Sequence, residues 1–178
     1  MKSDLEIVDF RLKLLMKLTD FINKNQMRGK IDVVLGSKTD KYPMPDVAIS
    51  YEKETTYEEY IAICNMAKET AGFDEEIKTY EAWQQSNSNI IEDLITIELF
   101  SSRDVEDTKS VLEWKIEKIK SQFEHTLFPE LQFGYVIDVF TQDTYKVNKS
   151  GSVRKIKLSS AMLFLKRFIL DFVKKQNY

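Results

Sequence analysis

The order of apolar and polar positions divides the first fifty residues into one helix and two strands. Residues 3–26 carry apolar side chains at helix spacing, and Gly29 then breaks the pattern. The residues at that spacing are Leu5, Val8, Leu12, Leu15 and Ile22. Residues 30–36 and 46–51 are short runs rich in β-branched side chains, which predict strands.

The middle of the chain interrupts this pattern with polar helical sequence. Residues 55–72 predict a helix that ends at Gly72, and residues 74–89 predict a second, more polar helix. We therefore interpret residues 52–90 as a helical insertion between core strands. Residues 93–100 then alternate as a strand, with Leu94, Thr96, Glu98 and Phe100 expected on one side.

The last part of the chain returns to alternating helices and strands. Residues 102–126 predict a long helix, and the nearly all-apolar segment 131–141 predicts a central strand. Residues 144–158 predict a hairpin, and residues 159–175 predict an amphipathic helix. We expect one α/β domain over residues 1–178, with a mixed central sheet flanked by helices and a helical insertion.

Composition excludes several classes of protein and site. The chain is 43% hydrophobic and 31% charged, and it contains no apolar run long enough to span a membrane. Its single cysteine fits a reducing, cytoplasmic location. One cysteine and one histidine are too few for a zinc site, and His125 is interpreted as a helix-end residue.

Positive charge is concentrated at the end of an otherwise acidic chain. The net charge is −3, but residues 144–178 hold nine lysines or arginines and one acid, Asp171. A solvated helix face would explain this concentration, and a surface that binds phosphates would also explain it. The hairpin residues expected to bind nucleic-acid phosphates are Lys146, Lys149, Arg154, Lys155 and Lys157.

Candidate chemistry rests on carboxylates and lysines. Asp46 follows Pro45 at the start of a predicted strand, and Glu98 lies in the middle of another. If Glu98 is buried, its carboxylate requires a compensating partner. If its strand is at the edge of the sheet, the carboxylate would instead face water. The apolar stripe of the 102–126 helix places Lys109 on the core-facing side near Glu98, and Lys115 is the second choice.

These segments together resemble the PD-(D/E)XK superfamily of restriction-endonuclease-like proteins, and within it the Uma family of small endonucleases. The matching stretches are "LLMKLTDFINKNQMRGKIDVVL", "PDVAIS", "DLITIELFSS", the helix from residue 103, and "LQFGYVIDVF". The resemblance implies a restriction-endonuclease-like fold in which Asp46 and Glu98 hold Mg²⁺ or Mn²⁺ and a helix lysine completes the site. Phe100 occupies the position of the usual strand lysine.

Two functions follow from this resemblance. The first is a magnesium-dependent endonuclease, a hydrolase that cleaves DNA through Asp46, Glu98 and Lys109. The second is a catalytically inactive protein of the same fold that binds protein or nucleic acid, with the 52–90 insertion and its aromatic residues as the partner surface. The sequence does not decide whether the protein forms a homo-oligomer. Glu6 and Asp9 would either add a carboxylate to the site or be surface charges, and Asp138 would either be structural or lie near the site.

Overall fold

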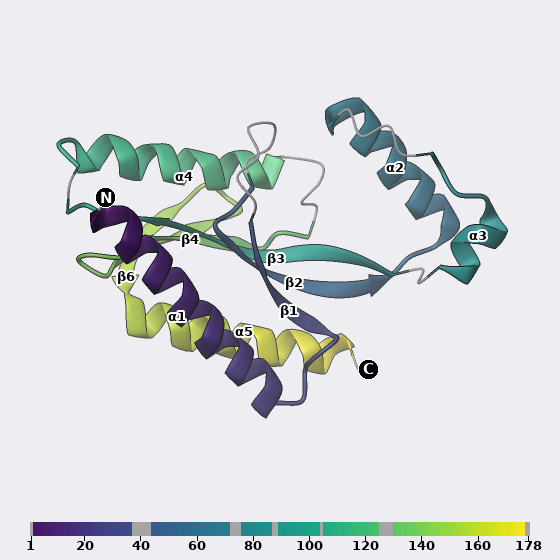
Figure 1. Cartoon of the computed structure of the whole chain (residues 1–178), viewed down its shortest axis with the longest axis horizontal. Helices are drawn as coiled ribbons and strands as arrows, with labels where there is room; N and C mark the ends of the chain where they lie inside the picture. Colours follow the sequence, from purple (N-terminus) through teal and green to yellow (C-terminus); the bar gives the residue numbers. More distant parts are fainter. Residues whose placement is uncertain are drawn as a thin grey trace.

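A central β-sheet enclosed by helices on both faces forms the body of the protein in the computed structural model (Figure 1). The structure describes residues 2–36, 44–71, 76–86, 89–103, 105–124 and 130–176. His125 lies outside these ranges. The predicted α/β class, with a mixed sheet flanked by helices, is confirmed.

Within the described residues, six strands form one sheet in the order of the chain. They are β1 (Ile31–Leu35), β2 (Val47–Glu54), β3 (Asn89–Phe100), β4 (Phe133–Asp138), β5 (Asp143–Asn148) and β6 (Val153–Lys157). β3 and β4 pair in parallel, and every other neighbouring pair is antiparallel. The parallel pair requires a crossover, which helix α4 (Thr108–Glu124) supplies.

Helices α1 (Lys2–Lys24) and α5 (Leu158–Gln176) cover one face of the sheet, and α4 covers the other (Figure 1). The larger apolar core lies between the sheet and the α1–α5 pair. Its fully buried members include Leu18, Ile49, Ile97 and Leu165. A smaller cluster under α4 contains Phe100, Ile119, Val136 and Val147.

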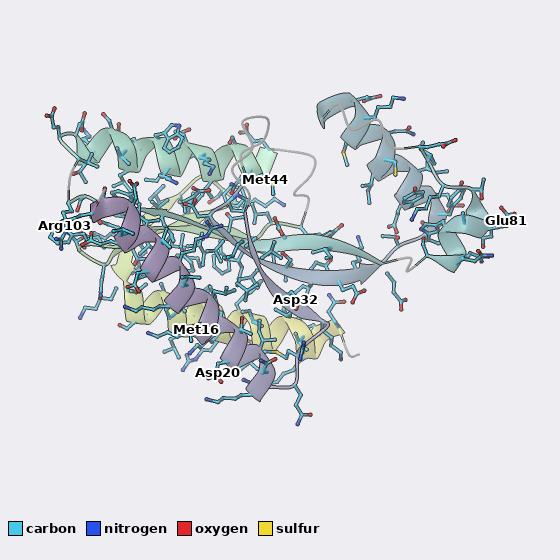
Figure 2. All side chains as sticks on the ribbon, viewed as in Figure 1. Met16, Asp20, Asp32, Met44, Glu81 and Arg103 are labelled. Carbon is cyan, nitrogen blue, oxygen red and sulfur yellow. The ribbon has the colours of Figure 1, made fainter. Side chains whose placement is uncertain are left out.

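Helix α1 forms as expected, but most of the apolar residues that predicted it do not face the core. Leu5 is 70% exposed and Val8 is 52% exposed. Met16, labelled on α1 in Figure 2, is also 70% exposed. The buried side chains are Leu14, Leu18 and Ile22. Because α1 is apolar on two faces, helix spacing alone could not identify the face that packs on the sheet.

The insertion extends away from the sheet (Figure 1). It contains α2 (Tyr57–Ala71) and α3 (Tyr80–Gln85), which is shorter than predicted and begins after the capping side chain of Thr79. β2 and β3 continue their pairing as far as Glu54 and Asn89, so the two strands form the base of the insertion. Among the described residues, no helix is long and apolar enough to cross a membrane.

A β-bulge changes which side chains of β3 face each layer. The register with β2 shifts between Ile49 and Ser50, and Leu94 has no direct partner there. Leu94 therefore joins Ile95 in the larger core, where simple alternation predicted opposite sides. Glu98, beyond the bulge, keeps the α4 side of the sheet together with Phe100.

Candidate active site

Glu98 lies at the centre of a buried polar cluster beneath α4. β3 is an inner strand, hydrogen-bonded to β2 and β4, and the Glu98 side chain has no exposed surface. The edge-strand alternative, with Glu98 in water, is therefore wrong. A fully buried carboxylate requires compensating partners, since its desolvation costs several kcal/mol.

Three side chains of α4 surround the Glu98 carboxylate. Lys115 Nζ lies 2.8 Å from Oε2, and Lys118 Nζ lies 2.8 Å from Oε1 and 2.9 Å from Oε2. Gln122 Nε2 donates a longer hydrogen bond of 3.4 Å to Oε1. Both carboxylate oxygens are thus bound by ammonium groups, which compensates for the burial of Glu98.

Asp46 joins this group from the start of β2. Its Oδ2 accepts a 2.7 Å hydrogen bond from the backbone amide of Leu99 and lies 3.0 Å from Lys115 Nζ. The Lys115 ammonium therefore bridges two carboxylates that are far apart in the sequence. We call Asp46, Glu98, Lys115, Lys118 and Gln122 the Glu98 cluster.

The sequence of α4 and a glycine opposite it explain how these side chains reach the sheet. Lys115, Ile119 and Gln122, spaced by four and three residues, are the buried positions of α4. A Cβ atom at Gly134 on β4 would lie 2.7 Å from Ile119 Cγ2 and 3.0 Å from Thr96 Oγ1. The absence of a side chain at Gly134 thus allows α4 to approach β3 and β4 closely.

Lys109 does not join the cluster, so the first choice of lysine is corrected to Lys115. The Lys109 side chain is 84% exposed and lies 3.8 Å from Glu113 one turn later. The apolar residues of α4 did not identify its most buried face. That face carries two polar residues, Lys115 and Gln122, beside Ile119. Lysines and a glutamine spaced along one helix face, opposite a glutamate in an apolar strand, were the available signal.

Phe100 fills the position that a strand lysine would occupy two residues after Glu98. It is 5% exposed and packs in the apolar cluster under α4. The strand therefore contributes an apolar side chain to helix packing at this point. The ammonium group beside Glu98 comes instead from Lys115 of α4.

Burial and charge pairing act in opposite directions on the ionisable groups of the cluster. Burial raises the pKa of Glu98, and the Asp46 carboxylate adds to this, while Lys115 and Lys118 oppose it. Burial also acts to raise the pKa of Asp46, but Lys115 and the Leu99 amide outweigh it and lower that pKa overall. Burial acts to lower the pKa of Lys115, and the two carboxylates outweigh it, so that pKa is raised.

The other acids considered from the sequence have structural partners elsewhere. Glu6 accepts a hydrogen bond from Ser101 and pairs with Arg103 at 2.8 Å, while Asp9 pairs with Lys13 on the surface. The two Glu6 contacts tie α1 to the β3–α4 connection.

Asp138 at the end of β4 holds the neighbouring loops. Its carboxylate accepts hydrogen bonds from the amides of Ser102 and Phe140 and from the Thr141 hydroxyl. Burial acts to raise the pKa of Asp138, but these hydrogen bonds lower it overall. Asp138 is therefore a loop-fixing residue, outside the Glu98 cluster.

The basic residues of the β5–β6 hairpin do not share one surface. Lys146 Nζ lies 3.7 Å from the ring centre of Phe164 in α5, and burial lowers the pKa of Lys146. Arg154 is the cross-strand neighbour of Lys146, so alternation places Lys155 on the opposite face, where it pairs with Asp143 at 2.8 Å. Lys149 and Lys157 are exposed at opposite ends of the hairpin. Phosphate binding by this hairpin stays a prediction.

Comparison with known proteins adds no relative: no family model matches the chain, and no curated protein is significantly similar to it. Functional inference therefore rests on the geometry of the cluster. Among the described residues, no group of three or more acidic, histidine or cysteine side chains is placed to hold a metal. The Glu98 cluster provides two carboxylates and two lysines, held by the sheet and by the middle of α4.

Proposed function

We propose that the protein is a metal-dependent nuclease that hydrolyses DNA phosphodiester bonds, with Asp46, Glu98 and Lys115 as its site. The observation that carries the proposal is the single ammonium group that bridges the two carboxylates, 3.0 Å from Asp46 and 2.8 Å from Glu98. An aspartate, a glutamate and a lysine converging from β2, β3 and α4 are the groups that such a reaction requires.

The donors fit a hard divalent cation. Asp46 and Glu98 offer carboxylate oxygens, which Mg²⁺ and Mn²⁺ prefer, and Mg²⁺ commonly binds proteins through one or two carboxylates while it keeps several waters. The Lys115 ammonium already holds a cationic position between the two carboxylates, so the space suits positive charge. When bound, the metal would polarise the phosphoryl group and lower the pKa of water.

The lysines have separate roles in this proposal. Lys115, which contacts both carboxylates, is the cation that faces the substrate phosphate and offsets charge that develops during the reaction. Lys118 contacts Glu98 through both oxygens and does not contact Asp46, so it positions the Glu98 carboxylate. Asp46, whose side chain is 29% exposed, forms the open side of the cluster.

Plasmid cleavage in the presence of Mg²⁺ or Mn²⁺ tests the proposal. Asp46→Asn keeps an oxygen that can accept the Leu99 hydrogen bond, and Lys115→Ala removes the bridging ammonium. Each variant is expected to lose activity by about 10²-fold or more. Lys109→Ala, on the exposed side of the same helix, is the matched control and should cleave normally.

The outcomes separate chemistry from folding. Circular dichroism on each variant would show whether the fold is retained. If the wild-type chain neither cleaves DNA nor binds either metal by calorimetry, the nuclease proposal is wrong. Cleavage that is unaffected by Asp46→Asn would place the activity at another site.

One observation favours the second function, an inactive protein of nuclease fold that binds a partner. Both oxygens of Glu98 are already bound by lysines, so the cluster is complete as a structural ion-pair network. The insertion also groups the aromatic side chains of Tyr57, Tyr60, Tyr80 and Trp83, with Tyr80 47% exposed. In this case, Asp46→Asn would leave partner binding unchanged, and Tyr80→Ala would weaken it.

A further inference from the structure

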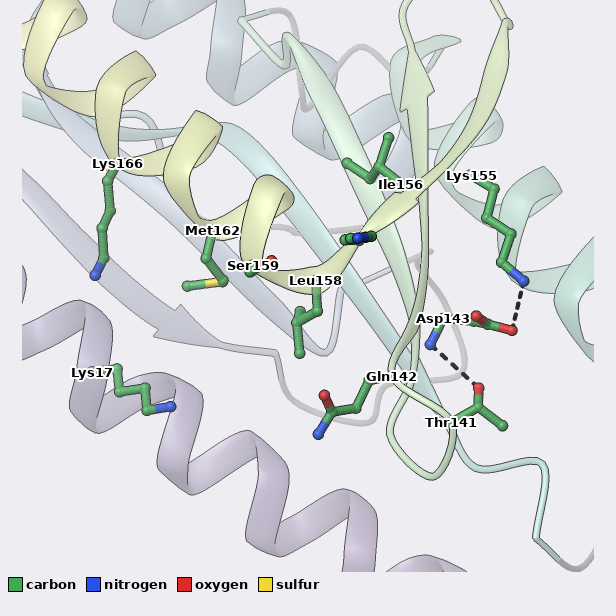
Figure 3. Close-up of a pocket in the computed structure, with 11 residues that line it drawn as sticks. Lys17, Thr141, Gln142, Asp143, Lys155, Ile156, Leu158, Ser159, Met162 and Lys166 are labelled. Carbon is green, nitrogen blue, oxygen red and sulfur yellow. Dashed lines mark hydrogen bonds and ion pairs between the residues drawn. The ribbon is translucent and has the colours of Figure 1, made fainter.

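A groove of about 800 Å³ lies between α1, the start of α5 and the end of β6 (Figure 3). It is remote from the Glu98 cluster in the layering of the fold, because α1 and α5 cover the face of the sheet opposite α4 (Figure 1). None of the residues that line the groove belongs to the Glu98 cluster. Its chemistry therefore requires a separate explanation.

Lysines from three elements line this groove. Lys17 comes from α1, Lys157 from the end of β6 and Lys166 from α5, and we call these three residues the lysine groove. Lys17 and Lys166 reach in from its two helical walls in Figure 3. Among the described residues, neither Lys17 nor Lys157 has an acidic partner within ion-pair distance, and Lys166 contacts the Phe21 ring.

Among the described lining residues, the groove has one acidic side chain, and that side chain already forms an ion pair. Asp143 is the acidic residue among the described lining side chains, and Lys155 binds it at 2.8 Å. The three groove lysines therefore leave a local excess of positive charge in a protein with a net charge of −3. Clefts lined by one sign of charge attract ligands of the opposite sign.

The rest of the lining is apolar. Ile156, Leu158 and Met162 also line the groove, at the junction of β6 and α5. The groove has the volume of sites for small molecules and cofactors, which range over about 300–1,000 Å³. A bare phosphate would use the lysines alone, whereas a phosphate joined to a flat organic group would also contact the apolar residues.

We propose that the lysine groove binds a nucleoside phosphate. Lys17 and Lys166 would contact the phosphates, and the base would lie against Leu158 and Met162. This ligand matches both the cationic and the apolar part of the lining. The proposal does not depend on nuclease activity, because the groove shares no residue with the Glu98 cluster.

Calorimetric titration of the whole chain with ADP tests the groove, with pyrophosphate and a short single-stranded DNA as separate probes. ADP is expected to bind more tightly than pyrophosphate, and its affinity should fall as salt concentration rises. The double variant Lys17→Gln/Lys166→Gln should weaken ADP binding by about tenfold or more. Lys24→Gln is the matched control on α1, because Lys24 pairs with Asp20 outside the groove.

Ser159→Glu gives a second test that does not depend on removing a lysine. Ser159 is exposed in the first turn of α5, where a carboxylate favours the helix, so the variant should fold at least as well as wild type. The same carboxylate would repel a phosphate in the groove, and ADP binding should fall. Asp46→Asn, in contrast, should leave ADP binding unchanged whether or not the protein is a nuclease.

Three results would overturn the proposal. The first is no heat of binding with millimolar ADP. The second is pyrophosphate binding as tightly as ADP, which would remove the base from the site. The third is lysine-dependent binding of the DNA strand without binding of ADP, which would make this face a nucleic-acid surface instead.

Discussion

The Glu98 cluster and the lysine groove both concentrate lysines, but they place them in opposite environments. In the cluster, Lys115 is buried and Lys118 is half-buried beneath α4, and both lie within 3.0 Å of carboxylates. In the groove, Lys17 and Lys157 line an open surface without an acidic partner among the described residues. A buried pair is compensated within the fold, whereas an open cationic surface is available to a ligand.

This difference separates stability from binding. Removing a charge from the cluster leaves its partners buried without compensation, so the fold should respond strongly. Removing a charge from the groove exposes nothing that was buried, so the fold should respond little. Variants of both regions test this contrast, beginning with the largest expected effect.

Glu98→Ala should be the most destabilising change in the cluster. It leaves the buried Lys115 ammonium and the half-buried Lys118 ammonium beside a cavity without their carboxylate. This should lower the free energy of unfolding by about 3–5 kcal/mol. Urea denaturation followed by circular dichroism measures the change. Glu113→Ala is the control, because its partner Lys109 is exposed.

A triple variant tests whether charge compensation is the cause. Glu98→Leu with Lys115→Met and Lys118→Met replaces these three ionic groups by apolar ones and leaves Asp46 bonded to the Leu99 amide. It should recover part of the stability lost in Glu98→Ala. If Glu98→Ala unfolds at the same urea concentration as wild type, the cluster does not compensate the burial as described.

Gly134→Ala should have an intermediate effect, because it acts on the approach of α4 to the sheet. The added Cβ would lie 2.7 and 2.9 Å from the Cγ2 and Cδ1 atoms of Ile119. Overpacking of this kind costs about 1–3 kcal/mol in free energy of unfolding. Ile119→Ala removes both of these atoms, so the double variant should be more stable than the sum of the two single changes predicts. Additive effects would show that the two residues do not contact each other.

Asp46 provides a pH-dependent comparison. Its pKa is lowered below the ordinary value of 3.8, so its contribution to stability is present above that value and is lost as the pH falls through the lowered pKa. Wild type should therefore be more stable than Asp46→Asn at neutral pH, and the difference should shrink below pH 3.8. The raised pKa of Glu98 makes stability change with pH in the opposite direction. Glu98 is present in both proteins, so the comparison between them reports on Asp46. Urea denaturation across this range would reveal the convergence, and a constant difference would contradict it.

The sequence predicted elements better than it predicted buried polar contacts. Apolar alternation located β3, and a nearly all-apolar run located β4. Asp46, at the start of β2, and Glu98 were singled out by their chemistry, and the fold brings them together through Lys115. The lysine itself was misplaced, because an apolar stripe indicates the inward face of a helix only when that face is apolar. On α4 the inward face carries Lys115 and Gln122, whose burial depends on Glu98 from another element.

The sequence could not predict the groove either, because its residues come from distant parts of the chain. Lys17 and Lys166 lie on helices at opposite ends of the chain, and they line one groove because α1 and α5 cover the same face of the sheet. The basic hairpin was recognised from its composition. Its residues diverge in the structure because neighbouring strand positions face opposite sides, as Lys146 and Lys155 do.

Lys17→Gln/Lys166→Gln should have the smallest effect on stability, within about 0.5 kcal/mol of wild type in free energy of unfolding. Both side chains lose a charge that has no carboxylate partner among the described residues, and the remaining lysine experiences less repulsion. The informative measurement is therefore thermal unfolding with and without ADP. A ligand that binds only the folded state raises stability in proportion to its occupancy, so ADP should raise the Tm of wild type more than that of the double variant. Equal shifts would mean that ADP binds elsewhere, and a large loss of stability without ADP would mean that these lysines are structural, as those beneath α4 are.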